Sequence, residues 1–111
     1  MNTGTRREKI EAMLVDDPQD NMLRYMLAME LDKAAEHDRS LELFAGLMAE
    51  TPPHVPAFLM AGQQLTKLNR IDEARTTLRE GIEAARTQGD SHAAGEMAEF
   101  LAQLGSMGST P

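Results

Sequence analysis

The chain has 111 residues, enough for one domain, with nine methionines, 4% aromatic residues and no cysteine, so a disulfide framework, a zinc knuckle and a thiol nucleophile are excluded. Its formal net charge of −7 argues against general nucleic-acid binding and against docking on an anionic membrane surface. No apolar run approaches the ~20 residues of a membrane span, and charged residues follow Arg6 and Arg7, so we expect no signal peptide and a cytoplasmic protein.

The first predicted element is a short helix over residues 5–15. Thr5 and Glu8 have the spacing of a capping box, in which each side chain accepts from the other's backbone amide. One face of this helix is apolar and comprises Ile10, Met13 and Leu14. We expect the helix to cover the N-terminal end of the helices that follow, and residues 1–4 to be a frayed lead.

Residues 17–50 are predicted to form a helical hairpin. Asp17-Pro18 reads as a helix start, because aspartate accepts from free amides and proline suits the first helical position. The first helix has leucines at spacings of four, namely Leu23, Leu27 and Leu31, and ends at a polar break over residues 33–38. The second helix runs from about Asp38 to Glu50, where Thr51-Pro52 stops it.

A second hairpin is predicted over residues 51–88, and a single helix over residues 90–104. Pro56 is tolerable only in the first turn of a helix, and Asn69 and Gly89 suit helix ends. Gly105 is expected to end the last helix, with residues 105–111 as a disordered tail.

The two hairpins share a period of 34 residues. Pro18 and Pro52 are one period apart, and so are the pairs Ala28 and Gly62, Ser40 and Ala74, and Phe44 and Leu78. Ile10 lies one period before Phe44. A fixed period of this length indicates a repeat architecture, in which each unit buries its apolar face against its neighbours.

The small residues at Ala28 and Ser40, followed by Phe44 and the terminal Pro52, resemble the tetratricopeptide repeat pattern over roughly residues 6–104. The chain departs from that pattern at Arg24, Leu47 and Gly81. The resemblance implies one all-α domain: a right-handed superhelical stack of antiparallel helix pairs, with about six helices. Residues 5–15 would be an N-terminal capping helix, 17–50 and 51–88 two repeats, and 90–104 a C-terminal capping helix.

The resemblance also implies a function, which is non-catalytic binding of a protein or peptide segment in the concave groove lined by the first helix of each pair. By register, the groove residues would be Met22, Tyr25, Met29, Lys33, Leu59, Gln63, Thr66, Lys67, His92, Glu99 and Gln103. Lys33 and Lys67 would give this groove a basic end that prefers an acidic residue or a free carboxylate. Met29 and Gln63 stand where chaperone-tail receptors have asparagine, which argues against an EEVD-type receptor.

No catalytic constellation is recognisable, so we expect no enzyme, no metal and no cofactor. The three histidines, His37, His54 and His92, fall at predicted turns or helix starts, and we expect them to be solvated. Two alternatives stay open. The exposed ends of a short array favour self-association into a weak homodimer, and an enzyme or small-molecule binder would instead need polar groups converging in a closed pocket.

Overall fold

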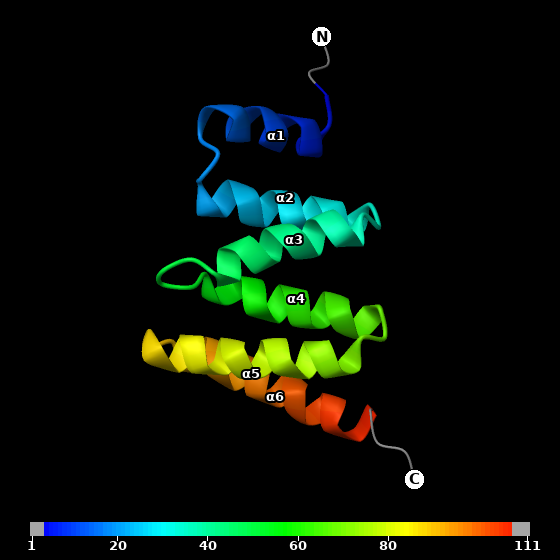
Figure 1. Cartoon of the computed structure of the whole chain (residues 1–111), viewed down its shortest axis with the longest axis vertical. Helices are drawn as coiled ribbons and strands as arrows, with labels where there is room; N and C mark the ends of the chain where they lie inside the picture. The colour runs from blue at the N-terminus through cyan, green and yellow to red at the C-terminus, as the bar shows by residue number, and fades with distance from the viewer. Residues whose placement is uncertain (1–3, 108–111) are drawn as a thin grey trace.

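The computed structural model describes residues 4–107, and the side chains of residues 4–105. This part of the chain is entirely α-helical, as the sequence predicts (Figure 1). The six helices are α1 (Arg6–Asp16), α2 (Asn21–Lys33), α3 (His37–Met48), α4 (Val55–Lys67), α5 (Ile71–Thr87) and α6 (Ser91–Met107).

The helices are stacked in chain order from one end of the molecule to the other (Figure 1). Helix α2 pairs with α3, and α4 with α5, while α6 packs against α5 and α1 against α2. The stack measures 56 × 32 × 19 Å and its radius of gyration is 15.1 Å, against about 13 Å for a globular domain of this length. It is therefore elongated, as expected when each unit contacts only its neighbours.

Two helix starts illustrate what the local sequence decides. The capping box predicted for α1 is present, because the amide of Thr5 donates to Glu8 Oε1 at 2.8 Å and the amide of Glu8 donates to Thr5 Oγ1 at 3.1 Å. Helix α2 begins three residues later than Asp17-Pro18 predicts: its cap is Asp20, whose Oδ1 accepts from the amide of Leu23 at 2.9 Å. The carbonyl of Asp17 instead accepts from the amide of Asp20, so Asp17 belongs to the turn.

The helix ends follow the repeat. Ala35 and Asn69, one period apart, both have a φ of 61°, and Gly89 after α5 has a φ of 75°. Helix α6 runs to Met107, so Gly105 does not end it as predicted. The rest of the predicted tail, residues 108–111, lies outside the described residues, as does the predicted frayed lead except for Gly4.

The core consists of three clusters along the stack. One lies between α1 and α2, one joins α2, α3 and the start of α4, and one joins α4, α5 and α6. Ile10, Phe44 and Leu78 are 1%, 1% and 0% exposed, which confirms the predicted equivalence of these positions. Met13, predicted to share the buried face of α1, is 48% exposed, whereas Leu14 packs against the cluster that contains Ile10.

Two glycines let neighbouring helices approach closely. A Cβ added to Gly81 would lie 2.5 Å from the Cβ of Phe58 and 2.6 Å from the Sδ of Met97. A Cβ added to Gly62 would lie 2.8 Å from the Cδ2 of Leu78. Gly81 therefore has a packing role in the junction of α4, α5 and α6, which explains a glycine where the repeat pattern prefers alanine.

Candidate functional site

A hollow of about 310 Å³ lies between α2, α4 and α6. Helices α2 and α4 are the first helices of their pairs and α6 follows in the same order, so we call these three the first-type helices. Its apolar lining consists of Tyr25 from α2, Val55, Pro56, Leu59 and Met60 from α4, and Ala93 and Met97 from α6; Asp90, His92 and Glu96 add polar groups. Helix α4 is the centre of the site, because it packs against both α2 and α6. The fold thus brings together Tyr25, Leu59 and His92, which the sequence placed in one groove.

The ring of Tyr25 is held by two other rings. Its centroid is 5.9 Å from that of Phe44 in an edge-to-face arrangement, and 5.4 Å from that of His54. Such aromatic contacts contribute beyond the area they bury. Burial raises the pKa of the Tyr25 phenol above its usual value, so this side chain presents a neutral hydroxyl and a fixed apolar ring to the hollow.

His54 is the residue before α4 and part of the wall behind Tyr25. Burial, followed by the positive charge of Arg24, holds the pKa of its imidazole below 6.5. Arg24 in turn donates to Glu50 at 2.9 Å and to Asn21 at 3.2 Å. This position, where the chain departs from the repeat pattern, therefore carries an ion pair between α2 and the connection that follows α3. The prediction of a solvated His54 is wrong, since its ring packs against Tyr25.

His37 is also less solvated than predicted. Its Nδ1 lies 2.8 Å from Gln64 Oε1 and 3.2 Å from Asp32 Oδ1. Gln64 is fully buried and donates from Nε2 to Ser40 Oγ at 3.0 Å, and Ser40 donates to the carbonyl of Ala28 at 2.6 Å. Because the amide oxygen of Gln64 only accepts, Nδ1 of His37 carries a proton. This chain of polar groups links α2, α3 and α4.

The two lysines at the far end of the groove are both paired. Lys67 Nζ lies 3.2 Å from Asp32 Oδ2, and Lys33 Nζ lies 3.1 Å from Glu30 Oε2. The predicted basic end is therefore not a free positive charge. The lysine side chains remain 66% and 68% exposed, while their carboxylate partners are 23% and 16% exposed.

The other predicted groove residues lie around the hollow without lining it. Met22 and Glu99 are exposed on α2 and α6, as is Gln103, and Met29 packs against the core cluster of α2 and α3. Gln63 is half-buried on α4, and Thr66 donates its hydroxyl to the carbonyl of Gly62 at 2.8 Å. His92, unlike these, does line the hollow; it is exposed at the rim, with its Nε2 3.7 Å from Glu96 Oε1.

Sequence reasoning missed several residues of the site. Asp32 lies one period before Thr66, which was named, so the register itself would have found it. Ala93 and Met97 carry the i, i+4 spacing of a helix face and replace the predicted Glu99 and Gln103.

Within residues 4–107, no group of three or more histidine, aspartate or glutamate side chains is placed to hold a metal ion. None of the helices described is long and apolar enough to cross a membrane.

No protein-family model matches the chain, and no curated protein matches it. Among solved structures, the solution structure of a tetratricopeptide repeat domain protein from Salinibacter ruber is 30% identical; the match covers 86% of this chain and 96% of that chain, with a TM-score of 0.79. The solution structure of a protein from Bordetella parapertussis is 24% identical, covering 95% of this chain and 91% of that chain, with a TM-score of 0.80. The first shares sequence and fold with this chain, and the second shows the fold alone.

Proposed function

Because this chain belongs to the tetratricopeptide repeat family, we propose that it is a non-catalytic interaction module that binds a segment of a partner protein between α2, α4 and α6. The observation that supports this most is the hollow lined by Tyr25, Leu59 and Met60 on the first-type helices. We use the name "concave hollow" for this site below.

The concave hollow suits an apolar anchor from a partner. Tyr25 is already fixed by Phe44 and His54, so little side-chain freedom is lost on binding. The volume of the concave hollow, about 310 Å³, is at the lower end of the ~300–1,000 Å³ range of small-molecule sites. A site of this size fits one or two side chains of a peptide better than a whole small-molecule substrate.

The lysine end suggests what accompanies the anchor. Lys33 is eight residues after Tyr25 on α2, which places it roughly 12 Å further along the helix axis. A carboxylate of the partner at that distance would join Asp32 or Glu30 at an exposed lysine. The proposed ligand is therefore a segment with an apolar side chain and, further along, an acidic residue or a free carboxylate.

The test fills the concave hollow without removing core packing. Ala93 lines the hollow and is only partly buried, so Ala93→Arg places a long charged side chain in it while Tyr25 keeps its contacts with Phe44 and His54. Partners captured from the source lysate by the wild-type chain and identified by mass spectrometry should be lost from the variant at least tenfold. Arg79→Gln, on the exposed side of α5, is the matched surface control and should retain them. Unchanged capture by Ala93→Arg, with an unchanged melting temperature, would contradict the proposal.

Self-association is the second candidate, and one observation favours it. Three large apolar side chains are exposed near the N-terminal end of the stack: Met13 (48%), Val15 (80%) and Met22 (59%). A homodimer through this end would show a mass near twice 12.2 kDa by light scattering at high concentration, and Val15→Glu would return it to the monomer mass.

A further inference from the structure

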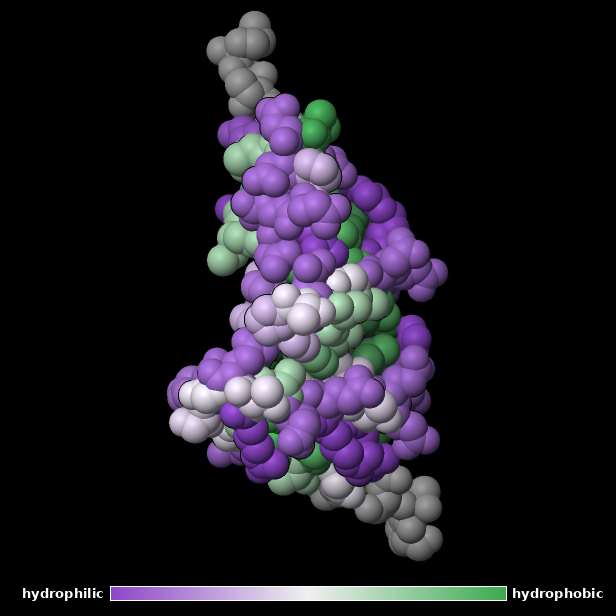
Figure 2. Space-filling model, turned by 60° about the vertical axis from the view of Figure 1, so that its left-hand side comes forward, coloured by the Kyte–Doolittle hydropathy of each residue, from purple (hydrophilic) through white to green (hydrophobic). Residues whose placement is uncertain are grey.

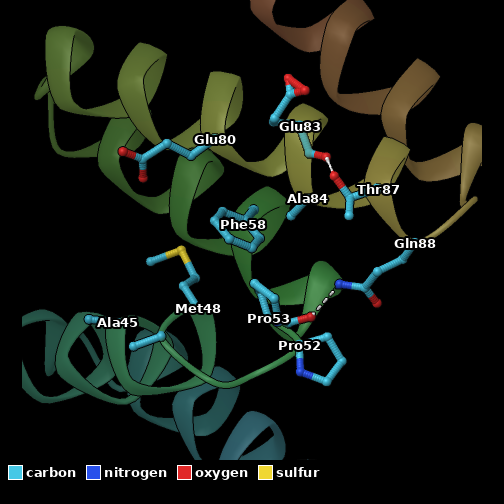
Figure 3. Close-up of a pocket in the computed structure, with 11 residues that line it drawn as sticks. Ala45, Met48, Pro52, Pro53, Phe58, Glu80, Glu83, Ala84, Thr87 and Gln88 are labelled. Atoms are coloured by element: carbon cyan, nitrogen blue, oxygen red, sulfur yellow. Dashed lines mark hydrogen bonds between the residues drawn. The ribbon is translucent and has the colours of Figure 1, made fainter.

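A second and larger hollow, of about 680 Å³, lies between α3 and α5, the second helices of the two pairs. Figure 3 shows Phe58 at its centre, with Met48 and Ala45 of α3 on one side and Glu80, Ala84 and Thr87 of α5 on the other. Pro52 and Pro53 of the α3–α4 connection form one end. We call this hollow the α3–α5 groove. It shares no lining residue with the concave hollow, although α4 contributes different residues to both.

The walls of the α3–α5 groove are apolar and its end is fixed. Met48, Phe58 and Ala84 belong to, or pack against, the core cluster of α4, α5 and α6, so the groove opens directly onto the core. Gln88 Nε2 donates to the carbonyl of Pro53 at 2.9 Å, which ties the end of α5 to the α3–α4 connection (Figure 3). In the space-filling view, apolar and weakly polar surface crosses the middle of the molecule between hydrophilic surface above and below (Figure 2).

The rim of the groove carries unpaired negative charge. Glu80 and Glu83 line it from α5, both exposed, and neither carboxylate forms an ion pair with any residue of the described range 4–107. Glu42, three residues before Ala45 and therefore on the same side of α3, is exposed and equally unpaired within that range. Arg79 and Arg86 lie on an adjacent side of α5 and do not line the groove.

We propose that the α3–α5 groove docks a basic amphipathic segment of a second partner protein. Apolar side chains of that segment would pack against Phe58 and Met48, and its arginines or lysines would meet Glu80 and Glu83 at the rim. Charge selects this occupant: a second copy of the chain carries a net charge of −7 and would bring like charge to an acidic rim. Arginine fits best, because its planar fork pairs with carboxylates in a fixed geometry.

This surface is separate from the concave hollow, so the chain would hold two segments of opposite charge preference on two faces. The chain would then bring two partner proteins together, and a chain with a single groove could not do this.

The test uses two capped synthetic peptides and the ¹⁵N-labelled full-length chain. Both peptides carry leucines one helical turn apart; one has flanking arginines, and the other has glutamate at each arginine position. The arginine peptide should shift the amide signals of Ala45, Met48, Ala84 and Thr87 and leave those of Tyr25 and Ala93 unchanged. The glutamate peptide should bind at least tenfold more weakly.

Variants separate charge from shape. Glu80→Gln with Glu83→Gln removes both rim charges at exposed positions and should weaken the arginine peptide about threefold to tenfold, with a reduced dependence on salt. Ala45→Arg, also at an exposed helix position, both fills the groove and repels the peptide, and should abolish binding. Arg79→Gln is the control on the neighbouring side of α5 and should bind like the wild type.

Four outcomes would overturn the proposal: absence of shifts at millimolar peptide, shifts confined to the concave hollow, equal binding of the glutamate peptide, or unchanged binding by Ala45→Arg. A concentration-dependent shift of the same groove signals without peptide, removed by Ala45→Arg, would overturn it as well, because it would make a second copy the occupant.

Discussion

At the scale of the residue, Gly81 shows how one missing side chain sets the distance between helices. The Cβ that any other residue would add there meets the Cβ of Phe58, which is fixed to its backbone and has no rotamer that moves it away. At Gly62 the added Cβ would meet the fully buried side chain of Leu78, at 2.8 Å from its Cδ2 and 2.9 Å from its Cγ.

We predict that Gly81→Ala lowers the free energy of unfolding by about 1–3 kcal/mol, although alanine is the better helix former. Gly95→Ala is the matched control: an added Cβ has no neighbour within 4 Å there, so the change should stabilise by about 0.5–1 kcal/mol. Urea unfolding followed by circular dichroism measures both. A neutral Gly81→Ala would show that the junction of α4, α5 and α6 has room to spare.

His54 predicts a dependence of stability on pH. Its pKa is lowered by burial, so the folded chain binds this proton less readily than the unfolded chain. The stability it contributes is therefore present above pH 6.5 and is lost as the pH falls through the folded-state pKa. Glu30, Glu36 and Glu73 have their pKa lowered from 4.5 by hydrogen bonds to lysine or arginine, so their contribution is lost only at lower pH.

The loss of stability between about pH 7.5 and pH 5.5 should accordingly be smaller in His54→Asn than in the wild type. Asparagine is a favoured residue before a helix and does not titrate, so this variant keeps the start of α4. The same pH dependence in both proteins, measured by urea unfolding, would mean that other groups cause it.

At the scale of the element, most of the fold was predictable because periodicity is a property of the chain itself. Leucines at spacings of four, and prolines 34 residues apart, report helices and their ends without knowledge of tertiary contacts. Helix starts were less predictable where two aspartates compete: Asp17 and Asp20 both suit a cap, and the turn closed by the Asp17 carbonyl and the Asp20 amide leaves Asp20 as the cap. The extension of α6 through Gly105 reflects the modest cost, about 1 kcal/mol, of glycine inside a helix.

The candidate site was predictable only in the part that obeys the repeat. Tyr25 and Leu59 are one period apart and both line the concave hollow. On α6, Ala93 and Met97 lie one period after Leu59 and Gln63, so the same register leads to them. The predicted Glu99 and Gln103 lie one period after Leu65 and Asn69, which are not groove positions, and they do not line the hollow. The pairing of Lys67 with Asp32 joins α4 to α2, which no spacing along one helix reveals.

Helix α1 is the element whose removal is most informative. Ile10 covers Leu27 and Leu31, which are 6% and 0% exposed, so deleting residues 1–16 would leave an apolar face of α2 in water. We predict a lower melting temperature together with aggregation in size-exclusion chromatography. The lid interpretation of α1 fails if the shortened chain melts as before and elutes as a monomer.

At the scale of the whole molecule, the stack has no single central core, and its stability is the sum of contacts between neighbouring helices. Because each helix packs mainly against its neighbours in the stack, two long faces of the molecule stay exposed. One presents the concave hollow with paired lysines further along, and the other presents the α3–α5 groove with unpaired glutamates. The exposed lysines and the unpaired glutamates therefore lie on different faces of one acidic chain.

The most direct measurement of the central claim is the amide spectrum of the ¹⁵N-labelled chain with a peptide that spans the segment bound by a captured partner. Binding in the concave hollow predicts that the largest shifts fall on Tyr25, Leu59 and Ala93, from three different helices, and that the Ala93→Arg variant shows none of them. Shifts confined to α1, or to α3 and α5, with the signals of the hollow unchanged, would contradict the claim.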